Sequence, residues 1–322
     1  MEPAAHPTLE GIGEAAVLQR IFPRLPAAGA ALIGPGDDAA VVAASDGRFV
    51  VTTDTMIAGP DFRFAWSTPH DLGWKAAATN LADIAAMGAV PTALVVALAV
   101  PASTPVSVLE ELADGFADAC AGLAPGCGVV GGDLAVSPTF TIAVTAFGDL
   151  DGRLPVLRSG ARVGDEVAVS GVLGAAGRGL ALLFTDAVDA EGTPDAARAR
   201  AVRSTSPDDV NAQLAPTPPI ADGVLAAIAG ATAMIDVSDG LALDARRIAD
   251  ASGVTIDLEA EAVGSIDALT GGEDHALLAS FPHDTPLPGG FRRIGSVSEG
   301  TGLTIDGHPF DARGGWDPFR DA

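Results

Sequence analysis

Residues 67–91 read STPHDLGWKAAATNLADIAAMGAVP, and this stretch decides the first element of the fold. Its alanines and leucines favour a helix, and a serine and a threonine stand before Pro69, so that one of them can cap the first turn. The helix is expected to end at Gly88. Asn80 and Asp83 are three residues apart and therefore share one face of it.

Strands and helices alternate on both sides of this helix. Valine-rich runs bounded by turn residues predict strands at 39–44, 49–53, 93–100, near 129 and at 139–148, with helices at 13–22 and 106–122. Turn residues at 150–165 separate this part from a similar mixture, with helices after 174 and at 239–251, strands at 254–258 and 275–281, and an exposed segment at 186–209. We expect an α/β (α+β) fold of two domains, residues 1–150 and 151–322, with mixed sheets and helices packed on one side.

The composition excludes several classes of partner. The formal net charge is −24, which argues against nucleic acid and anionic membranes as direct partners. The most apolar stretch, residues 89–102, is too short for a bilayer and contains two prolines. The N-terminus lacks a basic region followed by an apolar one, so we expect a cytoplasmic protein. In that compartment Cys120 and Cys127 are expected to be buried thiols, with a disulfide as the alternative.

Acidic residues recur beside small or hydroxyl residues at the ends of apolar runs. The motifs are IGPGDD (Asp37, Asp38), VVTTDT (Asp54), NLAD (Asp83), VVGGDL (Asp133), MIDVSDG (Asp236, Asp239) and LTGGEDH (Glu273, Asp274). Each alone is typical of a turn or a cap. If they converge, two charges about 4 Å apart repel by about 4 kcal/mol at an effective dielectric constant near 20. No lysine or arginine lies inside these motifs, so we expect divalent cations, and oxygen ligands combined with substrate phosphates are typical of Mg²⁺.

Such a chain is predicted to be a nucleotide enzyme without the common phosphate loops. It has no G-x-x-x-x-G-K-[ST] motif and no protein-kinase signature. The glycine-rich run SGVLGAAGRGLALL, residues 170–183, lacks a strict G-x-G-x-x-G. We interpret it as a turn that enters a helix, near a phosphate.

Taken in order, the motifs resemble the thiamine-monophosphate kinase family over nearly the whole chain. The resemblance rests on GPGDDAAVV, VTTDTMIAG, DLGWKAAATNLADIAAMGAVP, GGD, RSGARVGDEVAVSG, IDVSDGLALDARRIA, GGEDHALL and GGWDPF. It implies ATP-dependent phosphorylation of thiamine monophosphate to thiamine diphosphate with several Mg²⁺ ions. It also implies a homodimer in which the N-terminal strands form a barrel at the interface. The alternatives are another ATP-using superfamily enzyme with a different small-molecule acceptor, or a non-catalytic protein that binds Mg²⁺ and nucleotide.

The resemblance also assigns roles to residues. The implied metal ligands are Asp38, Thr52, Thr53, Asp54, Asp83, Asp133, Asp236 and Asp239, with Asp37 shaping the turn. The residues implied to contact ATP are Gly132, Asp133, Arg158 and Ser238. Those implied to face the substrate are Asp61, Glu273 and Trp316, an aromatic face and carboxylates being suited to a cationic thiazolium. From the residues alone, Trp316 could equally pack in the core.

No catalytic residue is assigned, for a chemical reason. A phosphate monoester has its second pKa near 6, so the acceptor oxygen of thiamine monophosphate is already ionised at neutral pH. The motifs depart from the family pattern on the substrate side: Asp61 stands where a histidine is common, Pro219 replaces an arginine, and His275 replaces a tyrosine. Ala175 and Ala176 replace an acid and a hydroxyl. These departures fall on the substrate side and in the second domain, and the metal motifs are intact.

Overall fold

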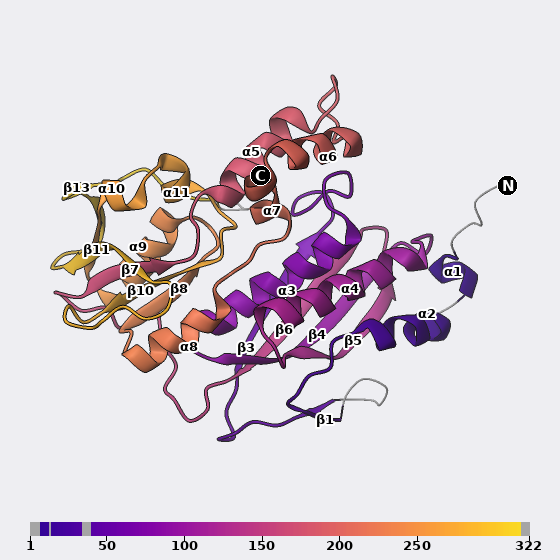
Figure 1. The fold of residues 1–322 in the computed structure, drawn as a ribbon, viewed down its shortest axis with the longest axis horizontal. Coiled ribbons are helices and arrows are strands. Elements are labelled where there is room, and N and C mark those ends of the chain that lie inside the picture. Colours follow the sequence, from indigo (N-terminus) through magenta and orange to yellow (C-terminus); the bar gives the residue numbers. More distant parts are fainter. Residues whose placement is uncertain (1–6, 13, 34–39, 317–322) are drawn as a thin grey trace.

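The computed structural model describes residues 7–12, 14–33 and 40–316, which form two larger β-sheets with helices packed against them (Figure 1). Asp38, a predicted metal ligand, and Asp37 lie outside the described residues. Helices and mixed strands alternate along the chain, so the predicted α/β (α+β) class is confirmed.

The first sheet has four strands in the order β3-β6-β4-β5. β3 (Val50–Ile57) and β4 (Val90–Val100) both pair antiparallel with β6 (Thr141–Asp149), and β5 (Gly128–Val136) is parallel to β4. The parallel pair is joined through α4 (Val106–Leu123), because parallel neighbours need a crossover connection. The strand expected at residues 49–53 is longer than the sequence predicted: β3 pairs with β6 over its full length, and Asp54 lies inside it, opposite Val144.

α3 (Pro69–Ala86) begins as the sequence predicts. Thr68 accepts a hydrogen bond at its side chain from Asp71 N, and Asp71 accepts one from Thr68 N, so both ends of a capping box are present. This reciprocal pair satisfies backbone donors that no helical turn could satisfy. The cap therefore fixes the residue at which the helix starts, and with it the positions of Asn80 and Asp83.

α3 and α4 cross at two glycines on one face of the sheet (Figure 1). A β-carbon added to Gly73 would lie 2.0 Å from Leu112 O, and one added to Gly115 would lie 2.1 Å from His70 O. Neither position has room for a side chain, so the two backbones touch directly. This contact holds α3 rigidly over the sheet.

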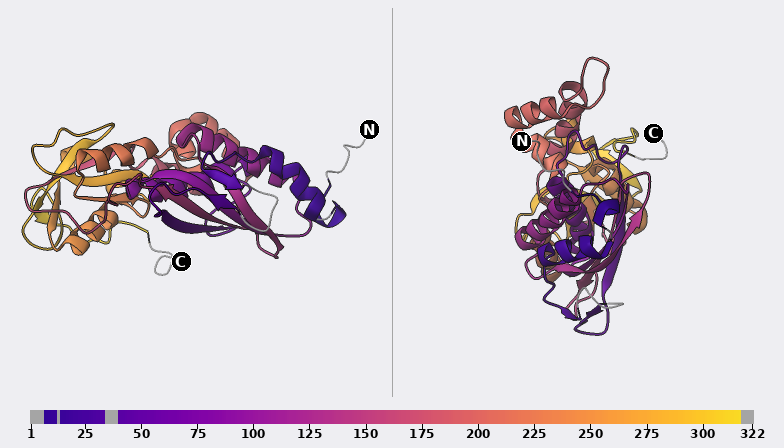
Figure 2. Two further views of the ribbon diagram at one scale, coloured as in Figure 1. Left: turned by 90° about the horizontal axis from the view of Figure 1, so that it is seen from below. Right: turned by 90° about the vertical axis from the view of Figure 1, so that its right-hand side faces the viewer.

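The opposite face of the four-stranded sheet carries no helix in the described part of the chain (Figure 2). Side chains alternate between the faces, so Thr52 and Asp54 of β3 face α3 while their neighbours face away. On the uncovered face Val51 is 55% exposed and Ile57 is 38% exposed. We call this surface the open face.

The second sheet has seven strands in the order β13-β12-β9-β11-β7-β10-β8. Its strands are β7 (Glu166–Ser170), β8 (Ala233–Val237), β9 (Thr255–Leu258), β10 (Ala276–Phe281), β11 (Arg292–Ser298), β12 (Gly302–Ile305) and β13 (His308–Pro309). The helices beside it are α8 (Ile220–Ala229), α9 (Leu241–Ser252), α10 (Ala260–Val263) and α11 (Ile266–Thr270). β8 is an edge strand, and both β8 and β10 contact α3, which brings the two sheets together along the long axis of the molecule (Figure 2).

Three helices between the sheets form a separate small core. They are α5 (Ala175–Asp186), α6 (Ala196–Thr205) and α7 (Pro207–Leu214), and they pack around Trp66. The expected exposed segment at 186–209 thus folds in large part into α6 and the start of α7, because Asp195 caps α6 and Val202 packs in this core.

The N-terminal elements are α1 (Leu9–Ile12), α2 (Glu14–Ile21), η1 (Phe22–Arg24), β1 (Ala31–Ile33) and β2 (Val41–Val42). Cys120 and Cys127 are buried free thiols, and a hydrogen bond to Cys120 together with burial raises the pKa of Cys127. Among the described helices, none is both long enough and apolar enough to span a bilayer.

Candidate active site

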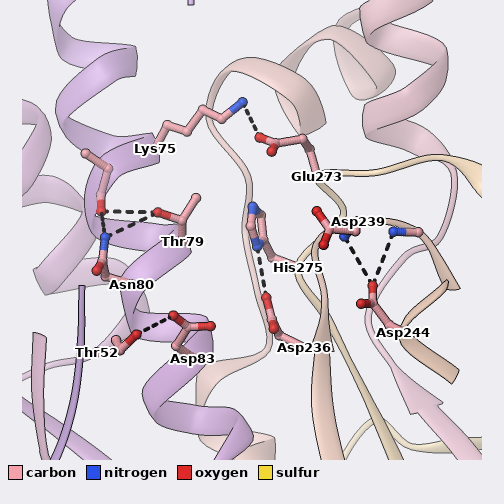
Figure 3. Close-up of polar contacts among 12 residues, drawn as sticks. Thr52, Lys75, Thr79, Asn80, Asp83, Asp236, Asp239, Asp244, Glu273 and His275 are labelled. Carbon is pink, nitrogen blue, oxygen red and sulfur yellow. Dashed lines mark hydrogen bonds and ion pairs between the residues drawn. The ribbon is translucent and has the colours of Figure 1, made fainter. Parts of the chain in front are cut away.

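Carboxylates from both halves of the chain meet where α3 faces β8 and β10 (Figure 3). Asp83 comes from α3 and Asp54 from β3, while Asp236 stands near the end of β8. Thr52 Oγ1 donates a hydrogen bond of 2.7 Å to Asp83 Oδ2. Residues more than 150 positions apart in the sequence are therefore gathered in one junction, as the recurrence of the acidic motifs predicted.

Burial and mutual repulsion raise the pKa values of these carboxyl groups. The pKa of Asp83 is raised to about 7, first by burial and then by the negative charges of Asp236 and Asp54. Solvent still reaches Asp54, but partial loss of hydration raises its pKa, with a further contribution from the charge of Asp236. The carboxylates of this junction thus repel one another and favour a bound proton or cation.

A second group of acids surrounds the start of α9. Arg247 lies 2.6 Å from both Asp239 and Asp244, and Asp244 Oδ2 accepts hydrogen bonds from the backbone N–H groups of Asp239 and Gly240. Asp244 is fully buried, and this burial raises its pKa to about 7 in spite of the arginine. Asp239 thus has a protein cation, Arg247, that lies outside the short acidic motif.

A glycine allows the chain to turn into α9 directly after Asp239. Gly240 has φ +123, and a β-carbon there would lie 3.0 Å from Thr270 O and 3.1 Å from Gly314 O. The left-handed conformation and the crowded backbone both require glycine. Asp239 O accepts a hydrogen bond of 2.9 Å from Trp316 N, so the C-terminal GGW segment closes over the same turn.

The segment 271–275 carries the second half of the site. Lys75 Nζ of α3 lies 2.6 Å from Glu273 Oε2, and His275 Nδ1 lies 3.3 Å from Asp236 Oδ2. Figure 3 shows the imidazole between the Lys75–Glu273 pair and Asp236. His275 is buried, and its Nε2 has no hydrogen-bond partner within the described residues.

Charge pairing sets the ionisation of this segment. Burial alone would raise the pKa of Glu273, but the positive charge of Lys75, and then that of His275, lowers it below its ordinary value. Burial alone would lower the pKa of His275, but the hydrogen bond to Asp236 and the charge of Glu273 raise it. Glu273 is therefore an anion, which a cationic ligand could approach.

Three residues predicted to bind metal or ATP lie away from this junction, on or beside the open face. Thr53 Oγ1 donates to Val144 O and accepts from Thr145 Oγ1, pointing away from Thr52. Asp133 is exposed on the same face and pairs in register with Ala97. A β-carbon on Gly132 would lie 1.9 Å from Val96 O, so this glycine permits the close pairing of β4 and β5.

An apolar cavity of about 750 Å³ borders Gly132 and Asp133. It lies between α2, α4 and strands β4 and β5, and Phe116, Leu112 and Val96 are among its lining residues. Its volume is within the range of small-molecule sites.

The remaining predicted residues fall in three places. Asp61 Oδ2 accepts a hydrogen bond of 2.7 Å from Ile57 N, closing the turn after β3. Arg158 is exposed, and its carbonyl accepts from Ser252, at the opposite end of α9 from Asp239. Trp316 is 51% exposed, so it is not a core residue.

The loops beside the site have partners of their own. Arg63, two residues after Asp61, lies 4.6 Å from the ring centroid of Trp66 and 4.7 Å from that of Phe184. The N-terminus of α5, expected near a phosphate, is occupied by Asp274, whose carboxylate accepts from Gly174 N at 2.5 Å and Ala176 N at 3.1 Å. Ser238 supplies its carbonyl to Glu273 N at 2.7 Å, which ties the two motifs together.

Four residues of the site were not assigned from the sequence: Lys75, Arg247, Asp244 and His275. Lys75 is the only lysine of the chain and stands in an apolar helix, which is itself a signal. Asp244 and Arg247 are three apart on the helix that follows the DVSDG motif, so they share a face with each other.

The comparisons with known proteins agree with this architecture. Residues 36–150 match the family described as AIR synthase related protein, N-terminal domain. That match gives the class of the N-terminal half, an AIR synthase related domain. In this chain, its strand β3 carries Asp54 and faces α3. The chain is also 45% identical to thiamine-monophosphate kinase of Mycobacterium tuberculosis (strain ATCC 25618 / H37Rv), over 97% of this chain and 93% of that protein.

Solved structures show the same relationship. The fold is similar to the crystal structure of thiamine-monophosphate kinase from Stenotrophomonas maltophilia K279a, with a TM-score of 0.73 and 31% identity, covering 91% of this chain and 95% of that one. It is also similar to AaThiL complexed with AMPPCP and TMP, with a TM-score of 0.72 and 32% identity, covering 88% and 91%. This chain belongs to the thiamine-monophosphate kinase family.

Proposed function

We propose that this protein transfers the γ-phosphoryl group of ATP to thiamine monophosphate, giving thiamine diphosphate and ADP. The observation that carries the proposal is the convergence of Asp54, Asp83 and Asp236, from both halves, in a junction where burial and mutual repulsion raise the pKa of Asp83 and Asp54. Support also comes from a relative complexed with AMPPCP and TMP.

Mg²⁺ fits the chemistry of this junction. The donors are carboxylates and a hydroxyl, the hard oxygen ligands that this ion prefers. Within the described residues, no three acidic, histidine or cysteine side chains are already arranged to hold a metal. We infer that Asp54, Asp83 and Asp236 hold Mg²⁺ together with nucleotide phosphates, and that Asp239 and Asp38 add to this set. When bound, the ions would neutralise the phosphate charge that otherwise repels an anionic acceptor.

The residues around the junction position the reactants. The acceptor phosphate is already ionised, so its oxygen needs no general base, and the step is a direct in-line displacement. Glu273 and the half-exposed Trp316 flank the Asp236–Asp239 loop. We propose that they receive the cationic thiazolium, an anion on one side and an aromatic face on the other.

We propose that the apolar cavity beside Gly132 accepts the base of ATP and that Ser238 lies toward the phosphates. Asp133 lies on the open face, so we propose that it contacts ATP or metal across the interface with a second copy. Arg158 remains a proposed phosphate contact although it stands at the far end of α9. Asp61 remains a proposed substrate contact, but it first has to leave its hydrogen bond to Ile57 N.

A homodimer formed through the open face would explain why two predicted metal ligands point away from the junction. Thr53 and Asp133 both lie on this face but on strands β3 and β5, three strand spacings apart, or roughly 14 Å. Exposed Val51 and Ile57 on the same face supply apolar surface for the contact. We propose that a second copy covers the open face and forms the barrel expected from the sequence.

We also propose that residues 1–150 and 151–322 are two domains, since the four-stranded sheet uses residues 50–149 and the seven-stranded sheet residues 166–309. The free thiols Cys120 and Cys127 are in keeping with a reducing compartment, and we propose the cytoplasm.

The test is direct. Purified protein is incubated with ATP, Mg²⁺ and thiamine monophosphate, and thiamine diphosphate and ADP are separated by chromatography. Both products should form in equal amounts, and Asp236→Asn should form neither at a comparable rate. ADP release with a different acceptor, but no thiamine diphosphate, would show that the chain is another ATP-using enzyme.

A further inference from the structure

Lys75 occupies a position where an ammonium group needs strong compensation. Its side chain is only 7% exposed in α3, and removing a charge from water is costly unless it is paired and hydrogen-bonded. Nζ lies 2.6 Å from Glu273 Oε2 and donates to Gln213 O at 3.0 Å. With the amide of Gln213 in the orientation that satisfies both of its ends, its oxygen accepts a third hydrogen bond from Nζ, at 3.2 Å.

These three contacts use all three protons of the ammonium group. Lys75 therefore has no donor left for a phosphate oxygen, although it stands beside the proposed phosphate site. The role of Lys75 at this position is therefore to hold Glu273 and Gln213.

The contacts of Lys75 are part of a closed ring of side chains and backbone. In the same orientation, the amide nitrogen of Gln213 donates to Ala176 O at 3.2 Å, and Ala176 N donates to Asp274 Oδ1 at 3.1 Å. Asp274 follows Glu273 directly, and Glu273 returns to Lys75. Four segments are joined in this way: α3, α7, the start of α5, and residues 271–275.

The last of these segments is strained. Glu273 has φ +70 and His275 has φ +50, in the left-handed region that non-glycine residues rarely adopt. Backbone strain of this kind persists only where the surroundings hold it. The backbone is fastened by Glu273 N to Ser238 O and His275 N to Val237 O, within its own half. The carboxylate of Glu273 is held from the other half, by Lys75.

We propose that Lys75 is a positioning residue that fixes the direction of the Glu273 carboxylate toward the thiamine moiety. The proposal rests on the proposed function and deepens it, because it makes recognition of the thiamine end depend on α3, the helix that also carries Asp83. Losing the charge of Lys75 frees Glu273 to rotate, and thiamine monophosphate binds more weakly while ATP binding does not change.

The test uses Lys75→Met, Glu273→Gln and the double variant. Lys75→Met keeps the length of the side chain and removes its charge. It should raise KM for thiamine monophosphate roughly tenfold, as expected for a lost charge-assisted hydrogen bond, and change KM for ATP less than about twofold. The double variant should be no worse than Glu273→Gln alone, because Lys75 acts through that carboxylate.

Trp74→Phe is the matched control. Trp74 Nε1 donates to Pro216 O at 2.7 Å, so this change removes another tie between α3 and the chain after α7 without touching Glu273. It should lower the urea midpoint and leave the ratio of the two KM values unchanged. Calorimetric titration of each variant with thiamine monophosphate alone gives a second readout, independent of turnover.

Each outcome decides one proposal. If the wild type makes no thiamine diphosphate, the proposed function fails, and the Lys75 proposal with it. If the wild type is active but Lys75→Met raises the KM for ATP as much as the KM for thiamine monophosphate, only the Lys75 proposal fails. It also fails alone if the double variant has a KM for thiamine monophosphate that is higher than that of Glu273→Gln by the full factor seen for Lys75→Met. If Lys75→Met does not fold, Lys75→Arg replaces it: its planar group cannot make the same three contacts. It should then raise KM for thiamine monophosphate only while Glu273 is present.

Discussion

Replacing Asp83 by asparagine should make the metal-free protein more stable at alkaline pH while abolishing most of its turnover. The pKa of Asp83 is raised from 3.8 to about 7 by burial and by the charges of Asp236 and Asp54. The folded protein therefore binds a proton more tightly than the unfolded chain. Such a group contributes stability that is fully present below pH 3.8 and is lost as the pH rises through about 7.

The magnitude follows from the pKa. At about 1.4 kcal/mol for each pH unit, the whole loss is about 4 kcal/mol, and about 3 kcal/mol of it falls between pH 5 and pH 8. Asparagine has nearly the same volume, and its oxygen can still accept the hydrogen bond from Thr52 Oγ1. The variant should therefore escape most of this loss.

The assay is urea denaturation in the presence of a chelator at pH 5.0, 6.5 and 8.0. The free energy of unfolding of Asp83→Asn minus that of the wild type should rise by about 3 kcal/mol from pH 5.0 to 8.0. Turnover should fall roughly a hundredfold or more, since the variant loses a proposed ligand of the Mg²⁺ that offsets the phosphate charge. Asp284→Asn, the same change at an exposed site after β10, controls for the substitution itself. A difference that stays constant with pH, or a variant less stable at pH 8.0, would refute the reasoning.

Three further predictions test the supports of the site. Thr68→Ala should lower the free energy of unfolding by about 1 kcal/mol in urea titrations, while Thr68→Ser keeps the cap of α3 and costs less; equal losses would contradict the capping role. Gly240→Ala should cost about 2 kcal/mol or more because of its positive φ and the nearby carbonyls, whereas Gly253→Ala, in open space, should cost about 1 kcal/mol; equal urea midpoints would count against the crowding argument. Trp316→Leu should raise KM for thiamine monophosphate roughly fivefold with little change in the urea midpoint, and a large fall in the midpoint would instead indicate a packing role.

Local signals explain what the sequence predicted well. The cap of α3, its alanine-rich body and the glycine at its end are all encoded within 25 residues, and the helix forms where they place it. The recurrence of acids beside apolar runs led to the expectation that several of them converge, and the structure brings Asp54, Asp83 and Asp236 near one another. Their role as metal ligands stays a prediction.

Tertiary contacts explain what the sequence missed. Lys75 and Glu273 are nearly 200 residues apart, so no local pattern pairs them. Arg247 stands eight residues after Asp239, outside the short motif MIDVSDG, so the pair is not visible in that motif. In the strand VVTTDT, alternation places Thr53 on the opposite face from Thr52 and Asp54. Which of these faces the site depends on the packing of β3 against α3, which no local pattern shows.

The glycine crossing of α3 and α4 also determines where this chain can change in length. Gly73 fixes the rotation of α3, and Asp83 follows it by ten residues, or roughly 15 Å of helix. One residue inserted between them would turn the rest of the helix by roughly 100° and move Asp83 away from Thr52, although every site residue would still be present. Insertions at the exposed residues 190–193 would leave these side chains in place, whereas an insertion between Gly73 and Asp83 would not.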